Sequence, residues 1–379
     1  MRQQEGRRRP EGRDVAEVVR LREEEPLALD GSYGEGGGQI VRTALALSVG
    51  LRRAVTISAI RAGRPRPGLR PQHLAVVRAL AVISDATVSG DTYGSMSVTF
   101  MPRGVRAGDY TFDIGADRGS AGAVSLLCQA LILPLCLARA PSRLTLIGGT
   151  HVPWSPPVHY LRDIFVPALR ELGIEVSLQV RRWGWYPSGG GAIDVTIAPA
   201  GETMGFVAEA LAATPLVTGV SAVSRLPRTI AERQRARVQE RLAAARVTCD
   251  IEIVEDETAV GPGTLVFLGI RGRAGFSALG RRGLPAERVA DLAVDELLAY
   301  LASGAAVDDY LADQLLPFLA LGANPSRLTC PRLSRHLETV AWVARQFVPV
   351  SIALVDDHPA RIVIIPERAP SHRPTPSGC

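Results

Sequence analysis

The sequence contains no lysine: among its 379 residues, all 43 basic side chains are arginine. Without lysine the chain cannot form a Schiff base with pyridoxal phosphate or complete a phosphate-binding loop of the Gly-Lys-Ser/Thr type. The lysyl-nucleotide intermediate used by nucleic-acid ligases is excluded for the same reason. Any covalent nucleophile must therefore be a residue of another type.

Cysteine is scarce, and long apolar runs are absent. The five cysteines are odd in number and include no C-x-x-C pair, so they predict neither a disulfide framework nor a structural zinc site. The longest apolar run, residues 126–138, is far shorter than the ~20 residues that cross a bilayer. The arginine-rich start is not followed by the apolar segment of a secretion signal. We expect a cytoplasmic protein that has no membrane partner.

Charge and aromatic content give little information about the partner. The 43 basic and 38 acidic residues leave a net charge of +5, which permits an anionic partner without requiring one. Only 5% of residues are aromatic, which argues against a generic RNA-binding module with aromatics interleaved on a basic face. The apolar share of 46% is enough for a large core.

A recurring pattern predicts the fold class. In four places a helix-like apolar segment leads through a short link into an alternating strand, as in residues 40–49 and 55–60. The other three pairs are 166–172 with 174–180, 230–245 with 247–254, and 340–347 with 350–355. This rhythm predicts an α/β protein whose α+β layers are built from repeated modules.

One stretch, residues 200–304, is interpreted as a small α/β domain inserted into a larger one. It contains strand patterns at 217–223, 247–254 and 264–270 and helix patterns at 230–245 and 286–302. The core domain then consists of residues 27–199 and 305–367. The charged start at 1–26 and the Pro-, Ser- and Gly-rich end at 368–379 are expected to be disordered tails.

A glycine-dense loop at residues 30–42 runs directly into an apolar helix pattern. Such a loop brings backbone N–H groups to an anion at a helix N-terminus. Glu35 lies within the glycine run and would repel a phosphate unless a divalent cation lay between them, which points to a magnesium ligand. A tight turn with a solvated carboxylate is the alternative.

An arginine- and proline-rich segment follows at residues 60–73. It holds four arginines in ten residues on a chain stiffened by three prolines. Arginine binds phosphate oxygens through two parallel hydrogen bonds, and proline lowers the entropy lost in fixing the loop. The segment therefore predicts a phosphate site, with a solvated surface as the alternative.

Two further rigid loops carry tryptophan. Trp154 lies among prolines at residues 153–157, and Trp185 precedes a glycine run at 189–191. Either ring could stack on a nucleobase, although a packing corner is the simpler interpretation of each.

The nucleophile has to be sought among the six histidines, because lysine is missing and no G-x-S-x-G elbow occurs. An imidazole with its ordinary pKa of ~6.5 is mostly neutral and nucleophilic at about pH 7. His336 stands at the head of a helical pattern with arginines nearby. Spacing alone does not set it above His73, His151 or His159.

Taken together, these motifs resemble the RNA 3′-terminal phosphate cyclase family over residues 27–366. The resemblance rests on Asp-Gly-Ser-Tyr-Gly-Glu-Gly-Gly-Gly-Gln at 30–39, Ile-Arg-Ala-Gly-Arg at 60–64, Pro-Gly-Leu-Arg-Pro-Gln-His at 67–73, Gly-Gly-Thr at 148–150, Tyr-Pro-Ser-Gly-Gly-Gly at 186–191, and Asp-Tyr-Leu-Ala-Asp-Gln-Leu at 309–315. One departure is Asp-Arg-Gly-Ser-Ala-Gly-Ala at 117–123, a lengthened turn with Ala123 where a serine is common in the family.

The resemblance implies a fold and a reaction. The fold is a core of three similar modules, each a four-stranded sheet with two helices, akin to the enolpyruvyl transferases, with an inserted domain like the C-terminal domain of translation initiation factor three. In the reaction a histidine attacks ATP to give histidyl-AMP. AMP passes to an RNA 3′-phosphate, and the neighbouring 2′-hydroxyl then closes a 2′,3′-cyclic phosphate.

The resemblance also implies the site residues. The nucleophile would be His336, which precedes the Phe-Val-Pro-Val strand entry at 347–350. Glu35 would hold Mg²⁺ or Mn²⁺. The ATP pocket would consist of Arg42, Gln129, Tyr310, Asp313 and Gln314, and the RNA phosphate would meet Arg61, Arg64, Gln72 and His73.

Two other classes stay open. A non-catalytic relative of the cyclases acting in ribosomal RNA processing or assembly would keep the fold and lack the histidine, whereas His336 is present here. An enolpyruvyl transferase would lack the inserted domain and would use lysines that this chain does not have.

Overall fold

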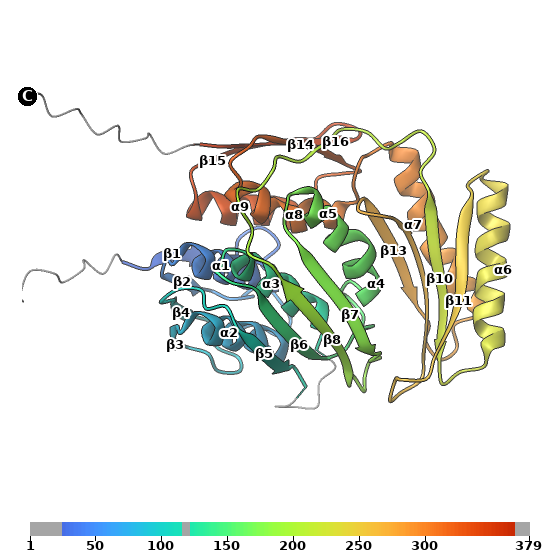
Figure 1. Ribbon diagram of the computed structural model, residues 1–379, viewed down its shortest axis with the longest axis horizontal. Helices are drawn as coiled ribbons and strands as arrows, with labels where there is room; N and C mark the ends of the chain where they lie inside the picture. Colours follow the sequence, from blue (N-terminus) through green and yellow to red (C-terminus); the bar gives the residue numbers. More distant parts are fainter. Residues whose placement is uncertain (1–24, 116–121, 368–379) are drawn as a thin grey trace, which may run out of the picture.

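The computed structural model describes residues 25–115 and 122–367, which form four four-stranded sheets (Figure 1). Three of the sheets belong to modules with the same order of elements: strand, helix, strand, helix, strand, strand. In each module the first two strands are parallel neighbours and the other neighbouring strands are antiparallel.

The first module is the amino-terminal one, with strand order β1-β2-β4-β3. Its elements are β1 (Leu27–Asp30), α1 (Gly38–Leu51), β2 (Val55–Ser58), α2 (Pro71–Ser84), β3 (Thr87–Ser89) and β4 (Val98–Met101).

The second module repeats this arrangement with strand order β5-β6-β8-β7. Its elements are β5 (Asp109–Asp113), α3 (Val124–Cys136), β6 (Ser142–Gly148), a continuous helical run of α4 (Val158–Tyr160), the π-helical turn η2 (Leu161–Phe165) and α5 (Val166–Glu171), then β7 (Val176–Arg182) and β8 (Gly191–Ile197).

The third module is interrupted after its first strand and has the order β15-β16-β14-β9. Its elements are β9 (Val207–Ala208), α8 (Asp309–Leu321), β14 (Ser326–Cys330), α9 (Arg335–Phe347), β15 (Val350–Val355) and β16 (Ala360–Pro366).

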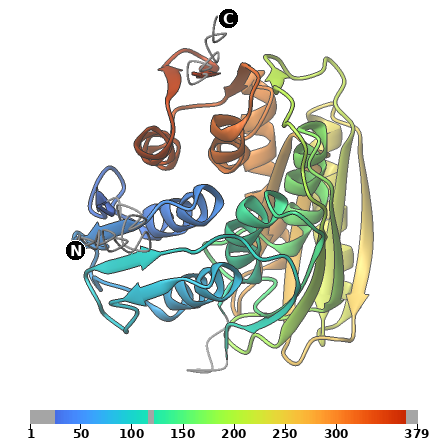
Figure 2. The same ribbon diagram turned by 60° about the vertical axis from the view of Figure 1, so that its left-hand side comes forward.

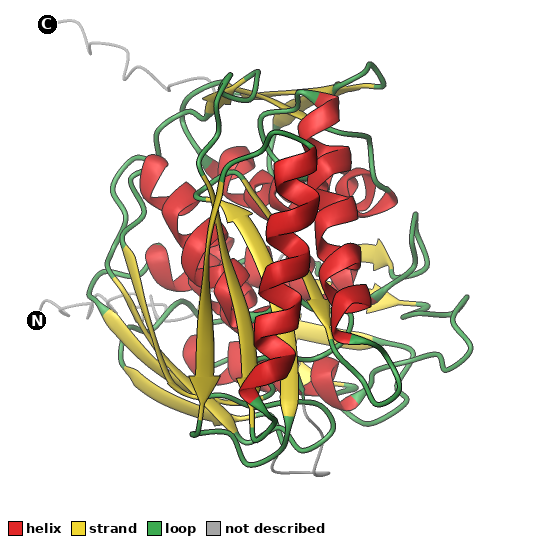
Figure 3. Cartoon of the chain, turned by 90° about the vertical axis from the view of Figure 1, so that its right-hand side faces the viewer, coloured by secondary structure: helices red, strands yellow, loops and turns green. Residues whose placement is uncertain are grey.

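The fourth sheet lies in the chain between β9 and α8, with order β11-β10-β12-β13. Its elements are β10 (Val217–Ser224), α6 (Arg228–Ala244), β11 (Cys249–Asp256), β12 (Gly263–Ile270), β13 (Ala274–Leu279) and α7 (Ala286–Ser303). The two long helices pack against each other and against this sheet (Figure 3).

The core forms where the helices of the three modules meet. Helix α1 contacts α2, α3 and α9, and the three sheets lie outside this helical centre (Figure 2). Because α1 is surrounded, it is apolar on nearly every side, and Ile40, Val41 and Leu45 are fully buried. The loop that enters α1 is thereby held close to the third module.

The predicted fold class is confirmed: the core consists of three modules, each with a four-stranded sheet and two helices. Within the 200–304 stretch, strand β13 was not predicted, since its six residues include Gly275 and offer only a short alternating pattern. The limits proposed for the inserted domain stay a prediction. The two expected tails lie outside the described residues, apart from residues 25 and 26, and so does most of the 117–123 turn.

Within the described ranges, no helix has both the length and the apolar character needed to cross a bilayer.

Candidate active site

A cavity of about 1190 Å³ opens where the three modules and the fourth sheet meet. All eleven predicted site residues line it, although they come from distant parts of the chain. They are Glu35, Arg42, Arg61, Arg64, Gln72, His73, Gln129, Tyr310, Asp313, Gln314 and His336. The structure therefore gathers the whole predicted set around one space, and the role of each residue stays a prediction.

His336 and Glu35 meet at the centre of this set. Oε2 of Glu35, in the loop between β1 and α1, lies 2.8 Å from Nε2 of His336, the second residue of α9. Helix α9 begins here because the Ser334 side chain accepts a hydrogen bond of 3.1 Å from the Leu337 N–H. The sequence thus fixes the helix start, and tertiary packing brings the carboxylate to it.

The glycine loop is fitted to α9 by a second contact. The backbone N–H of Glu35 donates to Oγ1 of Thr339 at 3.2 Å. The preceding Gly34 has a φ of +60°, and a Cβ there would lie 2.4 Å from the same Oγ1. Only glycine allows both this conformation and this approach, which explains the glycine density of the loop.

The contact between His336 and Glu35 shifts both pKa values. The carboxylate raises the pKa of His336 above its ordinary value of 6.5, and the imidazole lowers the pKa of Glu35. The expectation of an unperturbed imidazole is therefore wrong for this state of the protein, because Glu35 favours the protonated ring. The neutral, nucleophilic form is less populated at a given pH than the sequence alone suggests.

The arginines of the 60–73 segment divide their hydrogen bonds between the site and the loop. Arg64 forms an ion pair with Oε1 of Glu35 and donates to its carbonyl oxygen at 3.1 Å. Arg61 donates to the carbonyl oxygens of Arg66 at 2.7 Å and Gly68 at 3.0 Å, so it also holds the turn together.

Arg42 and Asp313 carry charge deep in the cavity. Burial lowers the pKa of Arg42 to about 10, partly opposed by Asp313 and Glu35. Burial raises the pKa of Asp313 to about 7. Arg42, which also donates to Gln39, is still cationic at neutral pH and is available to an anion.

His73 is neutral for a clear physical reason. Burial, reinforced by Arg42, Arg61 and Arg70, lowers its pKa to about 3. Its Nδ1 accepts a hydrogen bond of 3.1 Å from the Arg70 N–H, which assigns the ring hydrogen to Nε2. That nitrogen lies against Gly38 at the start of α1, where a Cβ would be 2.2 Å away.

Two half-buried glutamines on facing helices each have one buried amide atom that lacks a partner among the described residues. Nε2 of Gln129 on α3 and Oε1 of Gln314 on α8 are both buried without a hydrogen-bond partner among the described residues. Leaving a donor and an acceptor unpaired is costly, so a polar ligand between these helices would gain from both.

Several cavity residues were not predicted from the sequence. They are the loop 152–157 with Trp154, residues 277, 279, 280 and 281 at the end of β13, and Glu296 on α7. No local pattern marks Glu296, and the β13 residues were missed together with their strand. Trp154 was noticed, but its place was open until the tertiary structure brought its loop to the cavity.

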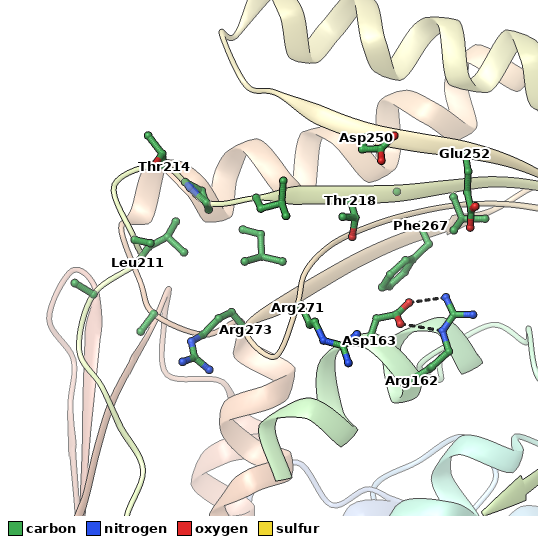
Figure 4. A pocket seen from close by; sticks show the side chains of 18 residues that line it. Arg162, Asp163, Leu211, Thr214, Thr218, Asp250, Glu252, Phe267, Arg271 and Arg273 are labelled. Atoms are coloured by element: carbon green, nitrogen blue, oxygen red, sulfur yellow. Dashed lines mark hydrogen bonds and ion pairs between the residues drawn. The ribbon is translucent and has the colours of Figure 1, made fainter. Parts of the chain in front are cut away.

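A smaller cavity of about 550 Å³ lies between η2 and the fourth sheet (Figure 4). None of the predicted site residues lines it. Two of its arginines are already used: Arg162 donates twice to Asp163, at 2.8 and 2.7 Å, and Arg273 donates twice to Glu171, at 2.7 and 3.0 Å. Its chemistry is therefore different from that of the larger cavity.

The side chains that could ligate a metal ion are few in this cavity. The described residues include no cluster of three or more His, Cys, Asp or Glu side chains that could hold an ion alone. Oε2 of Glu35 is buried and, apart from the His336 contact, has no hydrogen-bond partner in the described ranges. One carboxylate together with substrate phosphates is a common arrangement for Mg²⁺, and Glu35 fits it.

Comparison with known proteins identifies the family of this chain. The family model of RNA 3′-terminal phosphate cyclase matches residues 33–354. The chain is 44% identical over 332 residues to the RNA 3′-terminal phosphate cyclase of Methylococcus capsulatus, covering 85% of this chain and 91% of that one. It is 38% identical over 339 residues to the cyclase of the same name from Pyrobaculum neutrophilum, covering 88% and 96%.

Among solved structures, the enolpyruvyl transferase NikO from Streptomyces tendae is similar at 12% identity with a TM-score of 0.26, over 90% of this chain and 66% of that one. A likeness this weak supports no argument about function. Family membership is instead shown by the match over residues 33–354 and by the identities near 40%. On that evidence, the chain belongs to the RNA 3′-terminal phosphate cyclase family.

Proposed function

We propose that this protein uses ATP to convert an RNA 3′-phosphate into a 2′,3′-cyclic phosphate through a covalent histidyl-AMP on His336. The observation that carries the proposal is the position of His336, whose Nε2 lies 2.8 Å from Glu35 inside a cavity lined by arginines and unpaired amides. Family membership supports the overall reaction, and this geometry supports the residue roles.

In the first step, the neutral imidazole of His336 attacks the α-phosphorus of ATP. A P–N bond forms, and the P–O bond to pyrophosphate breaks. Because charge spreads over the phosphate oxygens as the leaving group departs, nearby cations lower the barrier. Arg42 and Arg64, which both line the cavity, supply such charge.

A magnesium or manganese ion would be held by Glu35 and would offset the charge of the ATP phosphates. Glu35 would then serve two partners, the metal and His336. Competition for this carboxylate would weaken its effect on the imidazole and lower the pKa of His336 toward the ordinary value. Binding of the substrates would in this way favour the nucleophilic form.

In the second step, an oxygen of the RNA 3′-phosphate attacks the phosphorus of histidyl-AMP, and the P–N bond breaks. The RNA end then carries a phosphoanhydride to AMP. In the third step, the adjacent 2′-hydroxyl loses its proton and attacks the RNA phosphate, and AMP leaves. The attack is intramolecular, so positioning contributes most of the acceleration, and DNA lacks the hydroxyl that reacts.

The proposal is tested by incubating the protein with α-labelled ATP and Mg²⁺ and measuring label on the denatured chain. We expect an acid-labile adduct on the wild type and none on His336→Ala. His358→Ala is the matched control, because His358 is exposed at the turn between β15 and β16. Full labelling of His336→Ala would remove this residue as the nucleophile.

The alternative, a non-catalytic cyclase-like protein acting in ribosomal RNA processing or assembly, predicts a different result. A folded wild-type protein would bind RNA and form no adduct under any metal condition. The presence of His336 beside Glu35 favours the enzyme.

A further inference from the structure

The four tryptophans of the chain occupy very different environments. The rings of Trp183, Trp185 and Trp342 each contact another aromatic ring. Trp154 is 98% exposed and makes no ring contact or side-chain hydrogen bond to any other described residue. Both faces of this ring are therefore free to stack on a ligand.

The loop around Trp154 is built to hold the ring where it is. Trp154 has a φ of +59°, a left-handed conformation that costs energy for a bulky residue. Ser155 Oγ donates to the carbonyl oxygen of Val152 at 3.1 Å, and the Val158 N–H donates to the carbonyl oxygen of Thr150 at 3.0 Å. Three prolines in 153–157 stiffen the same loop. The exposure of the ring is therefore fixed by a rigid backbone.

The same loop forms part of the wall of the active-site cavity. Residues 152–157 all line it, together with Arg61 and Arg64 of the first module. The cavity, at about 1190 Å³, exceeds the roughly 300–1,000 Å³ of a site for one small ligand. It has room for a second ligand beside ATP.

Within this cavity the ATP pocket already has its own partners. Nε2 of Gln129 and Oε1 of Gln314 are buried atoms, and Asp313 is only 6% exposed. Trp154 is instead open to solvent. An RNA chain whose end is bound in the cavity must also extend into solvent. A nucleobase stacks on a tryptophan face regardless of its identity, which suits an enzyme that acts at RNA ends.

We infer that Trp154 is a stacking platform for a base of the RNA at its reacting 3′ end. The inference rests on the proposed function, because it requires RNA to enter this cavity. Stacking would hold the terminal nucleotide while its phosphate reaches His336. Trp154 would act as a positioning residue for RNA and would leave formation of histidyl-AMP unaffected.

The test compares wild type, Trp154→Ala and Trp154→Phe on two reactions. We expect Trp154→Ala to raise the KM for a 3′-phosphorylated oligoribonucleotide roughly 10-fold and to leave the rate and ATP dependence of self-adenylation unchanged. Trp154→Phe, which keeps an aromatic face, should restore most of the RNA affinity. Since the side chain is exposed, the thermal unfolding temperature should not change.

An oligonucleotide lacking its terminal or penultimate base isolates the stacking contact. The wild type should bind the oligonucleotide that lacks the stacked base more weakly than the intact one. Trp154→Ala should bind both oligonucleotides with the same affinity, because its stacking contact is already lost. Equal losses for wild type and Trp154→Ala with both oligonucleotides would overturn the inference. So would an effect of Trp154→Ala on the KM for ATP alone, which would assign the ring to adenine.

Binding measured by quenching of tryptophan fluorescence separates this inference from the reaction. If no adduct forms on any variant, the proposed function fails. Quenching by RNA that is lost in Trp154→Phe would still place RNA at Trp154. Unchanged quenching in Trp154→Phe would overturn the inference even if the enzyme is active.

Discussion

Two histidine sites in this molecule have opposite designs. His336 is 43% exposed at the start of α9, beside a carboxylate that raises its pKa. His151 and His159 are 0% and 3% exposed, and burial lowers the pKa of both. Their rings pack at 5.2 Å between centroids, with Trp183 and Trp185 against them.

The buried pair makes its polar contacts within the protein. Nδ1 of His151 lies 2.8 Å from Oγ1 of Thr150, and its Nε2 lies 3.2 Å from Nδ1 of His159. His336 instead contacts one half-buried carboxylate and faces a cavity. The comparison teaches that a satisfied, buried imidazole contributes to the core, whereas an accessible one beside a charge is available for chemistry.

The largest expected effects come from removing one histidine of each site in turn, His336 or His151. His336→Ala should abolish the labelled adduct and cost far less stability than His151→Ala, because little packing is removed. His151→Ala should cost about 2–4 kcal/mol in the free energy of unfolding while its folded fraction still forms the adduct. Adduct yield and denaturant unfolding, measured on both variants, check this. Residual labelling of His336→Ala would contradict the comparison.

Glu35→Gln should give the next largest effect. Loss of the carboxylate should slow adenylation roughly 10–100-fold and raise the metal concentration needed for half-maximal rate. Because Glu35 raises the pKa of His336, its removal should move the acid limb of the pH–rate profile to lower pH. Glu338→Gln, an exposed change on the same helix, is the control. An unchanged acid limb would show that Glu35 does not raise the pKa of His336.

The contributions of the two histidine sites to folding stability should also change with pH in opposite directions. The unfolded chain protonates His159 near pH 6.5 and the folded chain only near about 3, so folding loses stability as pH falls through this window. His159→Phe should therefore flatten the acid-side loss, by up to about 1.4 kcal/mol per pH unit.

His336 has a raised pKa, so its contribution to stability is present below pH 6.5 and is lost as pH rises through the folded pKa. His336→Ala should accordingly lose more stability at pH 6 than at pH 8. Unfolding curves of both variants and the wild type between pH 5 and pH 8 measure the two slopes. Slopes of the same sign would break the comparison.

The smallest effect is expected from a satisfied polar group outside both histidine sites. Asp308 is buried, and accepts hydrogen bonds from the Tyr160 hydroxyl at 2.9 Å, the Leu311 N–H at 2.6 Å and the Gly275 N–H at 2.8 Å. It joins the second module and β13 to the start of α8. Tyr160→Phe removes one bond and should cost about 1 kcal/mol in stability.

Since α8 carries Asp313 and Gln314, the same change should raise the KM for ATP a few-fold at constant kcat. Steady-state adenylation kinetics measure this. A fall in kcat at unchanged KM would show that Tyr160 acts in the chemical step and not through α8.

The sequence by itself determined the modules, because hydrophobic periodicity is local. The segment 340–347 with 350–355 predicted α9 and β15, and 217–223 predicted β10, within a few residues of the observed bounds. It also excluded lysine chemistry and marked Glu35 and the 60–73 segment by composition. The short strand β13, with Gly275 in its interior, carried too weak a pattern to be found.

Only the tertiary structure decided which groups act together. Glu35 and His336 are 301 residues apart, and their contact depends on the packing of α1 against α9, which no local pattern encodes. Tertiary packing also left His336 accessible while it buried His151 and His159, and it exposed Trp154 while it buried Trp185. Burial and charge set the pKa of each imidazole, and both are properties of neighbours brought together by folding.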